Sequence, residues 1–467
     1  MDDLTPLLAR IQFAVTIGFH YIYPPLSIGL GIFLVIVEGL YLKTRDPLWR
    51  QVARFWTKIF ALTFAMGVAT GLVMEFEFGT NWATYSRFVG DVFGSALAAE
   101  GIFAFFLESG FLALLLFGWD KVGPKLHYFA TIMVCLGAHF SAVWIVVANS
   151  WMQTPAGYHI VQGPNGPRAE ITDFWALVFN PSSMDRLSHT LIGAWLAGAF
   201  LVLSVSAWYL LKRKHEVFAR ASMKVGLGFA VVASLLQLLT GSVSAEGVAK
   251  HQPAKFAAME GHYPASAPAA LVVVGWVDEQ HKTVNGLSIP GGTSLLLHQD
   301  FHAPVTGLDA IPADEHPPVQ LTFQAYHAMI GIGMSLIALS LFAALLWRTG
   351  RLERHRWMLW LLVFAVLGPQ LANQLGWMAA EVGRQPWIVQ GLMRTKDAIS
   401  PNVSSGQIIL SLGLFTVVYL GLFAAFLYLL NDKIQHGPDL EDAHGPLVTL
   451  PKKVADALSG HRAEGEG

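Results

Sequence analysis

The sequence predicts an all-α integral membrane protein that crosses the bilayer nine times, with its N-terminus outside and its C-terminus in the cytoplasm. Three observations lead to this fold class. Of the 467 residues, 54% are hydrophobic and only 13% are charged, a composition typical of membrane proteins. Nine segments each hold roughly 20 apolar residues, the length that crosses a bilayer as a helix. Lysine and arginine gather in alternate connections, which indicates the orientation.

The predicted spans follow one another along the chain, separated by polar connections. They cover residues 11–37, 55–78, 93–117, 126–150, 187–211, 221–243, 322–347, 357–379 and 406–430. The connections after the first, fifth and seventh spans ("KTRDPLWRQVAR", "KRKHEVFARASMK" and "RTGRLERHR") are basic, whereas residues 244–321 carry eight acids and three lysines. The positive-inside rule therefore places the three basic connections in the cytoplasm.

This pattern divides the chain into four regions. Residues 1–243 hold spans one to six, residues 244–321 form an outer loop, residues 322–430 hold spans seven to nine, and residues 431–467 form a polar cytoplasmic tail. A loop of more than seventy residues is too long for a simple connection, so we expect it to be a binding element. The sequence has no internal repeat of the kind found in inverted-repeat transporters.

Composition also excludes several classes of protein. Cys135 is the single cysteine and lies inside an apolar run, so a disulfide framework, a thiolate metal site and a covalent CxxCH haem attachment are all excluded. The formal net charge of −2 and the lack of a basic stripe argue against a nucleic-acid partner. The acidic start "MDDLTPLLAR" predicts no cleaved signal peptide.

Ionisable side chains inside the predicted spans are the first candidates for function, because burying them in a bilayer is costly. His20 lies in the first span, roughly 15 Å from its outer end at 1.5 Å per residue. Glu100 and Glu108 lie eight positions apart in the third span, about 12 Å along one helix face, an arrangement that suits a proton relay. The alternatives are a histidine that only hydrogen-bonds a neighbouring helix, and carboxylates that are neutralised by helix partners.

A histidine and a methionine open the fifth and seventh spans at a similar predicted depth. They are His189 in "SSMDRLSHTLIGAW" and Met329 in "LTFQAYHAMIGIGM". An imidazole and a thioether that face each other form an axial pair for a low-spin haem that transfers electrons. A methionine in a membrane helix is usually an ordinary packing residue, so the case for Met329 as a haem ligand depends on its pairing with His189.

The end of the eighth span, "LGWMAAEVGRQPW", holds charged residues between two tryptophans. Trp377 and Glu381 lie one turn apart, with Arg384 just beyond, at the predicted level of His189 and Met329. A structural interpretation is available, since tryptophans anchor helices at the interface and Arg384 can simply pair with Glu381.

Three stretches closely resemble subunit I of the cytochrome bd-type quinol oxidases: "GWMAAEVGRQPW", "GVATGLVMEFEFGTNW" and "AAEGIFAFFLESGF". The motifs are long, and the resemblance covers nearly the whole chain. It implies three non-covalent haems, electrons from a membrane quinol (ubiquinol or menaquinol) and reduction of O₂ to water. It also implies a homologous multispan subunit II, possibly a single-helix subunit, and a place in the bacterial cytoplasmic membrane.

The same resemblance assigns roles to individual residues. His189 and Met329 would ligate the low-spin haem b, and His20 and Glu381 the two high-spin haems, in an order that the sequence leaves open. Arg384 would pair with haem propionates or with Glu381, and Trp377 would line the site. The residues implied in oxygen-side proton transfer are Glu100, Glu108, Ser109 and Ser141, and those implied in quinol binding are Gln252, Lys255 and Glu260.

Two departures from the family pattern leave details open. The outer loop is short, as in the cyanide-insensitive oxidases, so the third haem is either haem d or a further haem b. His327 replaces a usual arginine two residues before Met329, from which we expect pH-dependent charge stabilisation near the low-spin haem. The rival functions are an ion or solute transporter and a haem-bearing electron-transfer or sensor subunit that does not reduce oxygen.

Overall fold

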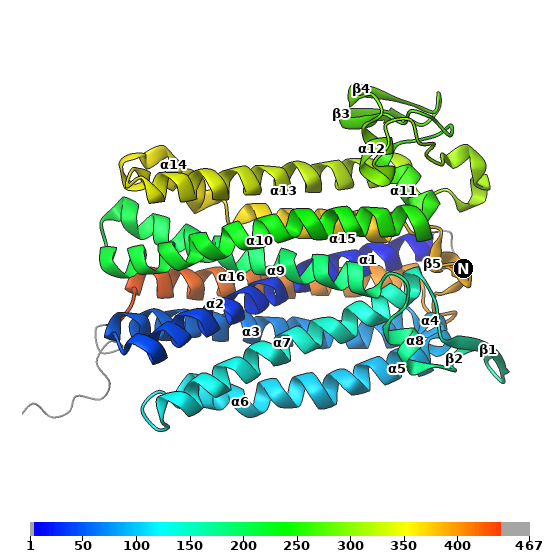
Figure 1. Cartoon of the computed structure of the whole chain (residues 1–467). Coiled ribbons are helices and arrows are strands. Elements are labelled where there is room, and N and C mark those ends of the chain that lie inside the picture. The colour runs from blue at the N-terminus through cyan, green and yellow to red at the C-terminus, as the bar shows by residue number, and fades with distance from the viewer. Residues whose placement is uncertain (1–3, 440–467) are drawn as a thin grey trace, which may run out of the picture.

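The computed structural model describes residues 4–439 and is mostly helical (Figure 1). Within this range, nine helical stretches are long and apolar enough to cross a membrane, which confirms the predicted spans. They are α1 (Leu4–His20) with α2 (Tyr23–Thr44), α3 (Pro47–Thr80), α5 (Gly90–Ala99) with η1 (Glu100–Phe105) and α6 (Phe106–Phe117), α7 (Pro124–Gln153), α9 (Ser183–Lys212), α10 (Glu216–His251), α13 (Val319–Arg348), α14 (Arg356–Phe364) with α15 (Leu367–Val382), and α16 (Ser405–His436).

Smaller elements connect the spans. The short helices are α4 (Ala83–Phe88), α8 (Phe174–Val178), α11 (Pro253–Glu260) and α12 (Gly292–His298). Three antiparallel hairpins depart from the all-α prediction: β1 (Tyr158–Gly163) with β2 (Gly166–Ile171), β3 (Leu271–Asp278) with β4 (Thr283–Ile289), and β5 (Trp387–Val389) with β6 (Met393–Arg394). β3, with the sequence LVVVGWVD, is rich in the β-branched and aromatic residues that favour a strand.

The two ends of the helix bundle differ in character (Figure 1). The hairpins, α11 and the start of α1 lie at one end, which we call the hairpin end. The turns after α2, α6, α9 and α13 lie at the other end, and three of them carry the basic residues of the predicted cytoplasmic connections, so we call it the basic end. The predicted tail is described only as far as residue 439, with α16 running to His436; residues 440–467 lie outside the described residues.

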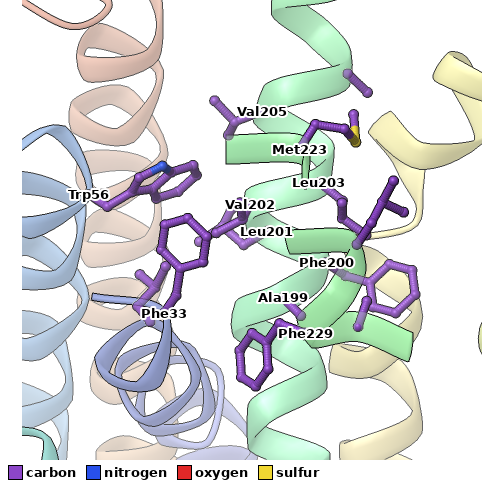
Figure 2. Packing of buried hydrophobic residues seen from close by; sticks show 14 of the residues in the cluster. Phe33, Trp56, Ala199, Phe200, Leu201, Val202, Leu203, Val205, Met223 and Phe229 are labelled. Atoms are coloured by element: carbon purple, nitrogen blue, oxygen red, sulfur yellow. The ribbon is translucent and has the colours of Figure 1, made fainter. Parts of the chain in front are cut away.

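The core forms where α2, α3, α9 and α10 pack together. Phe33 and Trp56 pack edge-on with ring centroids 5.7 Å apart, and Phe200 and Phe229 belong to the same buried cluster (Figure 2). The most apolar stretch of α9 is 83% buried within the chain, whereas that of α5–α6 is 17% buried and that of α16 is 11% buried. Hence α9 is central, and the outer helices present apolar faces to lipid or to another protein.

The helices break at candidate site residues. α1 ends at His20, and α2 starts three residues later, where Pro24 and Pro25 cannot continue the hydrogen-bond ladder of α1. A π-helical turn begins at Glu100 and separates α5 from α6. Such turns widen a helix locally and are frequent at functional sites.

The predicted outer loop is largely structured. α10 continues to His251, so residues 244–251 are helical, and the connection to α13 runs over residues 252–318. It contains α11, the β3–β4 hairpin, α12 and two 3₁₀ turns, η2 (Leu308–Ala310) and η3 (Ala313–Glu315). Asp278 caps the hairpin turn, since its carboxylate accepts hydrogen bonds from the backbone N–H groups of Gln280 and His281.

Candidate functional site

His20 is held at the end of α1 by a threonine of α3. Its Nδ1 lies 2.9 Å from Oγ1 of Thr70, whose own proton is donated to the carbonyl oxygen of Met66. Thr70 therefore accepts a hydrogen bond from Nδ1–H, which leaves Nε2 with a free lone pair, the form that ligates a metal. A Cβ at Gly71 would lie 3.2 Å from the imidazole, so this glycine leaves room for the ring.

His189 in α9 repeats this arrangement with α10. Its Nδ1 lies 3.3 Å from Oγ1 of Thr240, which donates its own proton to the carbonyl oxygen of Leu236. A Cβ at Gly241 would lie 3.3 Å from the imidazole. Each candidate histidine thus faces a Thr-Gly pair on a neighbouring helix. His189 differs in that the amide nitrogen of Gln237 lies 3.2 Å from both Nδ1 and Nε2, so Gln237 and Thr240 position this ring together.

Met329 lies across a four-helix ring from His189. This ring consists of α9, α10, α13 and α15; α9 and α13 each pack against both α10 and α15. The Met329 Sδ lies only 2.8 Å from the position that a Cβ at Gly376 of α15 would take. The predicted pair thus sits on opposite members of one ring, and glycines open space beside both side chains.

Glu381 lies at the hairpin end in a group that we call the Glu381 cluster, made of Asn149, Gln153, Arg186, Glu381 and Arg384. Its carboxylate pairs with Arg384 at 2.6 Å and lies 3.9 Å from Nη2 of Arg186. It accepts hydrogen bonds from Asn149 at 3.1 Å and Gln153 at 3.2 Å. Both arginine side chains are buried, and a charge so buried requires partners.

Trp377 packs at the edge of the Glu381 cluster. The Arg186 guanidinium carbon lies 5.6 Å from the centroid of its ring, and the ring of Tyr21 meets it edge-on at 5.6 Å. The indole therefore joins the cluster to the helix break at His20. A tryptophan that only anchored the helix at the bilayer interface would not need these contacts with Arg186 and Tyr21.

The predicted quinol residues join the Glu381 cluster through Gln153. The Gln153 side-chain oxygen accepts from Nε2 of Gln252 at 2.9 Å and from the Lys255 ammonium, while its amide nitrogen donates to Glu381. Lys255 also donates to Gln252 at 2.8 Å and is 2% exposed. Burial, together with the nearby Arg186 and Arg384, lowers the pKa of Lys255 well below the usual lysine value.

Glu260 lies at the other end of α11 and contacts the ring side of α13. The hydroxyl of Tyr326, one turn before Met329, donates a hydrogen bond to its carboxylate. Burial raises the pKa of Glu260 to about 7, against the opposing effect of that hydrogen bond. Among the described residues, Oε2 of Glu260 has no hydrogen-bond partner.

The predicted proton-transfer residues are only partly brought together. Ser141 of α7 donates to Glu100 at 2.5 Å, at the start of the π-helical turn. Glu108 is buried against α7, where a Cβ at Gly137 would come within 2.4 Å of its Cγ. Ser109 does not join them, because one residue further along α6 its side chain is exposed on the outer surface of the chain.

His327 takes a different position from the one we expected. Its Nε2 lies 2.7 Å from the carbonyl oxygen of Val272 in β3, and its ring stacks on Phe323. The side chain therefore holds the β3–β4 hairpin against α13.

Comparisons with known proteins agree with this arrangement. The family model described as "Cytochrome bd terminal oxidase subunit I" matches residues 8–438. The chain belongs to this family. It is 40% identical to the cytochrome bd ubiquinol oxidase subunit 1 of Bacillus subtilis (95% of this chain, 97% of that one) and 33% identical to the bd-II subunit 1 of Escherichia coli (94% and 98%). The bd oxidase structure from Geobacillus thermodenitrificans matches with a TM-score of 0.87 at 30% identity, covering 94% of this chain and all of that one.

Membership makes this chain subunit I of a terminal quinol oxidase, a multi-pass membrane enzyme that carries haem and works with a subunit II. The transporter and the non-oxidase alternatives are not favoured.

The residues of this subunit I fit haem groups. In the Glu381 cluster, Nε and Nη1 of Arg384 and Nε of Arg186 are buried without a hydrogen-bond partner among the described residues. Unpaired guanidinium donors suit the carboxylates of haem propionates. Glycines beside His20, His189 and Met329 leave space next to each candidate ligand.

Sequence reasoning missed Thr70, Thr240, Asn149, Gln153 and Arg186. Arg186 carried a usable signal, since it is a charge in the first turn of a span. Asn149 and Gln153, four residues apart at the end of α7, lie on one helix face. The threonines gave no signal alone, because a membrane helix commonly satisfies a hydroxyl with its own backbone.

Proposed function

We propose that this chain is the haem- and quinol-binding subunit I of an oxidase in the bacterial cytoplasmic membrane, with the hairpin end outside. The orientation follows from the basic residues at the opposite end. The observation that carries the proposal is the double role of Gln153, which bonds both the candidate haem ligand Glu381 and the candidate quinol residues Gln252 and Lys255.

His189 and Met329 are the proposed ligands of a low-spin haem b, and His20 and Glu381 those of two high-spin haems, the third being haem d or a further haem b. When bound, these groups supply electron transfer and oxygen reduction. Thr70 keeps the ligating nitrogen of His20 unprotonated, and Thr240 with Gln237 positions the imidazole of His189. Arg384 and Arg186 neutralise propionates, and Trp377 encloses that site.

Ubiquinol or menaquinol would bind beside α11. Gln252 and Lys255 orient the quinol head group, and Glu260 accepts a proton from one of its hydroxyls, as a base with a pKa of about 7 can. That proton leaves at the hairpin end. Tyr326, which bonds Glu260, lies one turn from Met329, so the proposed quinol site adjoins a residue that would hold the low-spin haem.

Protons for water formation would come from the basic end through Glu108 and then Glu100, with Ser141 holding the Glu100 carboxyl. Taking these protons from the cytoplasm while quinol protons leave outside builds membrane potential, at about 2.3 kcal/mol per charge per 100 mV. Ser109 would complete the route from the exposed face of α6, which belongs to a span only 17% buried within this chain and is therefore a candidate contact surface for subunit II. A single-helix subunit is a further proposed partner.

The optical spectrum of the purified, dithionite-reduced oxidase, with and without carbon monoxide, tests the proposal, since it counts the haems and detects an open iron. We expect Met329→Leu to remove the sharp low-spin band while keeping apolar volume. Met334→Leu is the matched control, because Met334 is exposed on the same helix and should leave the spectrum unchanged. An unaltered low-spin band in Met329→Leu would reject this ligand.

A further inference from the structure

The β3–β4 hairpin has an apolar face that nothing in the described chain covers. Val274, Trp276, Leu287 and Ile289 lie on it and are 69%, 66%, 70% and 50% exposed. Val274 pairs with Leu287 across the strands, so these side chains form one patch. Val272 and Val277 are buried on the opposite face, against the chain.

The hairpin lies lengthwise along the first turns of α13, beside the helix rather than beyond its end (Figure 1). Gln320 bonds Val277 and Glu279 near the hairpin tip, Gln324 donates to the Gly275 carbonyl, and His327 contacts the Val272 carbonyl. From residue 320 to residue 327 the helix rises roughly 10 Å. β3 therefore runs antiparallel to α13, with its tip at the helix end and its base deeper.

The base of the hairpin lies far enough along α13 to reach the boundary of the membrane. α13 has 30 residues and is thus about 45 Å long, against a hydrocarbon core of about 30 Å. About 7 Å of helix would extend beyond the core at each end if the helix were centred. The base of the hairpin then lies at the edge of the hydrocarbon, and its tip lies among the headgroups or in water.

Ionisable residues are distributed unevenly between the base and the tip of the hairpin. All its ionisable residues are in the tip, "DEQHK" at 278–282, whereas "LVVVGWV" and "TVNGLSI" have none. Further along α13, the apolar side chains of Ile330 and Met334 are also exposed. Tryptophan is favoured at this level of a bilayer.

We propose that the β3–β4 hairpin is a membrane-interface element, whose patch of Val274, Trp276, Leu287 and Ile289 contacts the acyl-chain boundary of the leaflet at the hairpin end. The extramembrane connection is then anchored laterally in lipid as well as to α13. The charged tip stays in water, which fixes the tilt of the hairpin.

Site-specific probes in the complete oxidase test this inference. The single cysteine of this chain, Cys135, is buried and can be replaced by alanine. Val274→Cys, Leu287→Cys and the tip control Gln280→Cys then each give this subunit one site for an environment-sensitive fluorophore, and the oxidase with Cys135 replaced and no added cysteine gives the background labelling. The complex is reconstituted in nanodiscs that contain phosphatidylcholine with a nitroxide near the top of the acyl chain. Iodide in the buffer reports exposure to water.

We expect severalfold stronger lipid-nitroxide quenching at positions 274 and 287 than at 280, with the reverse order for iodide. Iodide quenching at 274 and 287 equal to that at 280 would overturn the inference, because the patch would face water. Protection from both quenchers would also overturn it and would show that another protein covers the patch. The haem spectrum checks the folding of each variant, and either patch position alone is sufficient for the test.

Discussion

At the scale of single residues, the site depends on uncharged side chains as much as on the ionisable ones. Thr70 sets the tautomer of His20, and Thr240 with Gln237 positions the ring of His189, each across a helix contact. Gln153 uses its two amide ends to join Glu381 to Lys255. Such neutral groups cost less to bury than charges and still fix the geometry of their neighbours.

Thr240→Val should raise the midpoint potential of the low-spin haem. The variant keeps the shape of the side chain but removes the acceptor of the His189 Nδ1–H bond, so the imidazole becomes a poorer electron donor. A hydrogen bond worth about 0.5–1.5 kcal/mol corresponds to roughly 20–60 mV for one electron. Redox titration followed at the low-spin band measures the shift. Thr416→Val, an exposed site on α16, should leave the potential in place.

Glu260→Gln should remove a pH dependence from quinol oxidation. Since the pKa of Glu260 is about 7, its carboxyl is protonated at lower pH and cannot accept a proton, so the rate should rise with pH through this value. Glutamine keeps the shape but cannot act as a base, so the variant should be slow and lack this rise. Initial rates with a soluble quinol across the pH range decide the matter; a retained rise would assign it to another group.

Glu108→Gln should slow oxygen reduction severely while haem content stays near normal. Glutamine can fill the same space against Gly137 but cannot carry a proton. Electron entry should persist, so the high-spin haems should accumulate in reduced or oxygen-bound states during turnover. Oxygen consumption and flow-flash spectroscopy are the measurements. A normal rate with full haem content would return Glu108 to a structural role.

At the scale of elements, the helices approach one another most closely where glycine faces glycine. A Cβ on Gly198 of α9 would lie 2.3 Å from the carbonyl carbon of Gly29 in α2, and one on Gly29 would lie 2.4 Å from the carbonyl oxygen of Ala194. Small residues allow this close backbone contact, which dispersion stabilises in a membrane. The central helix α9 is thereby locked to α2.

Gly198→Ala should destabilise the subunit, because the added methyl group meets backbone that cannot move aside. Overpacking typically costs about 1–3 kcal/mol. Gly228→Ala on α10 is the matched control: nothing lies within 4 Å of its added Cβ, so higher helix propensity should stabilise it slightly. Thermal unfolding in detergent, followed by haem absorbance, measures the Tm of each variant. We expect a lower Tm for Gly198→Ala and no decrease for Gly228→Ala. Equal Tm values would show that the contact relaxes.

At the scale of the whole molecule, structure and charge divide between the two ends of the bundle. The hairpins and the Glu381 cluster gather at one end, while short basic turns close the other. The proposed quinol site and the entry of the proposed proton route therefore lie at opposite ends. Charge separation across the membrane requires this arrangement.

Cysteine labelling tests the orientation of the whole chain. With Cys135 replaced, Gln280→Cys at the hairpin end should react with a membrane-impermeant maleimide in intact cells, whereas Lys214→Cys in a basic turn should react only after the cells are opened. Both sites are exposed, so access to the reagent alone separates them. The reverse pattern would invert the proposed topology.

The nine spans could be predicted without coordinates, because the hydropathy of a segment depends only on its own residues. The family was recognisable from the sequence, as were the candidates His20, Glu100 and Glu381, since charges in apolar surroundings are visible without coordinates. Lys255 lies outside the predicted spans and was a candidate only through the family resemblance. The predicted orientation and the haem-ligand roles remain predictions.

Which side chains meet became visible only in the folded chain. Thr70 lies 50 positions from His20 and Gln153 lies 228 positions from Glu381, and no local period encodes such hydrogen bonds. The folded structure also places the His327 ring against β3 and the Ser109 side chain on the outer surface of the chain. Hydrophobic periodicity specifies that a helix forms, whereas the rotation and neighbours of each helix follow from packing the whole bundle, where contacts such as Gly29 against Gly198 set the fit.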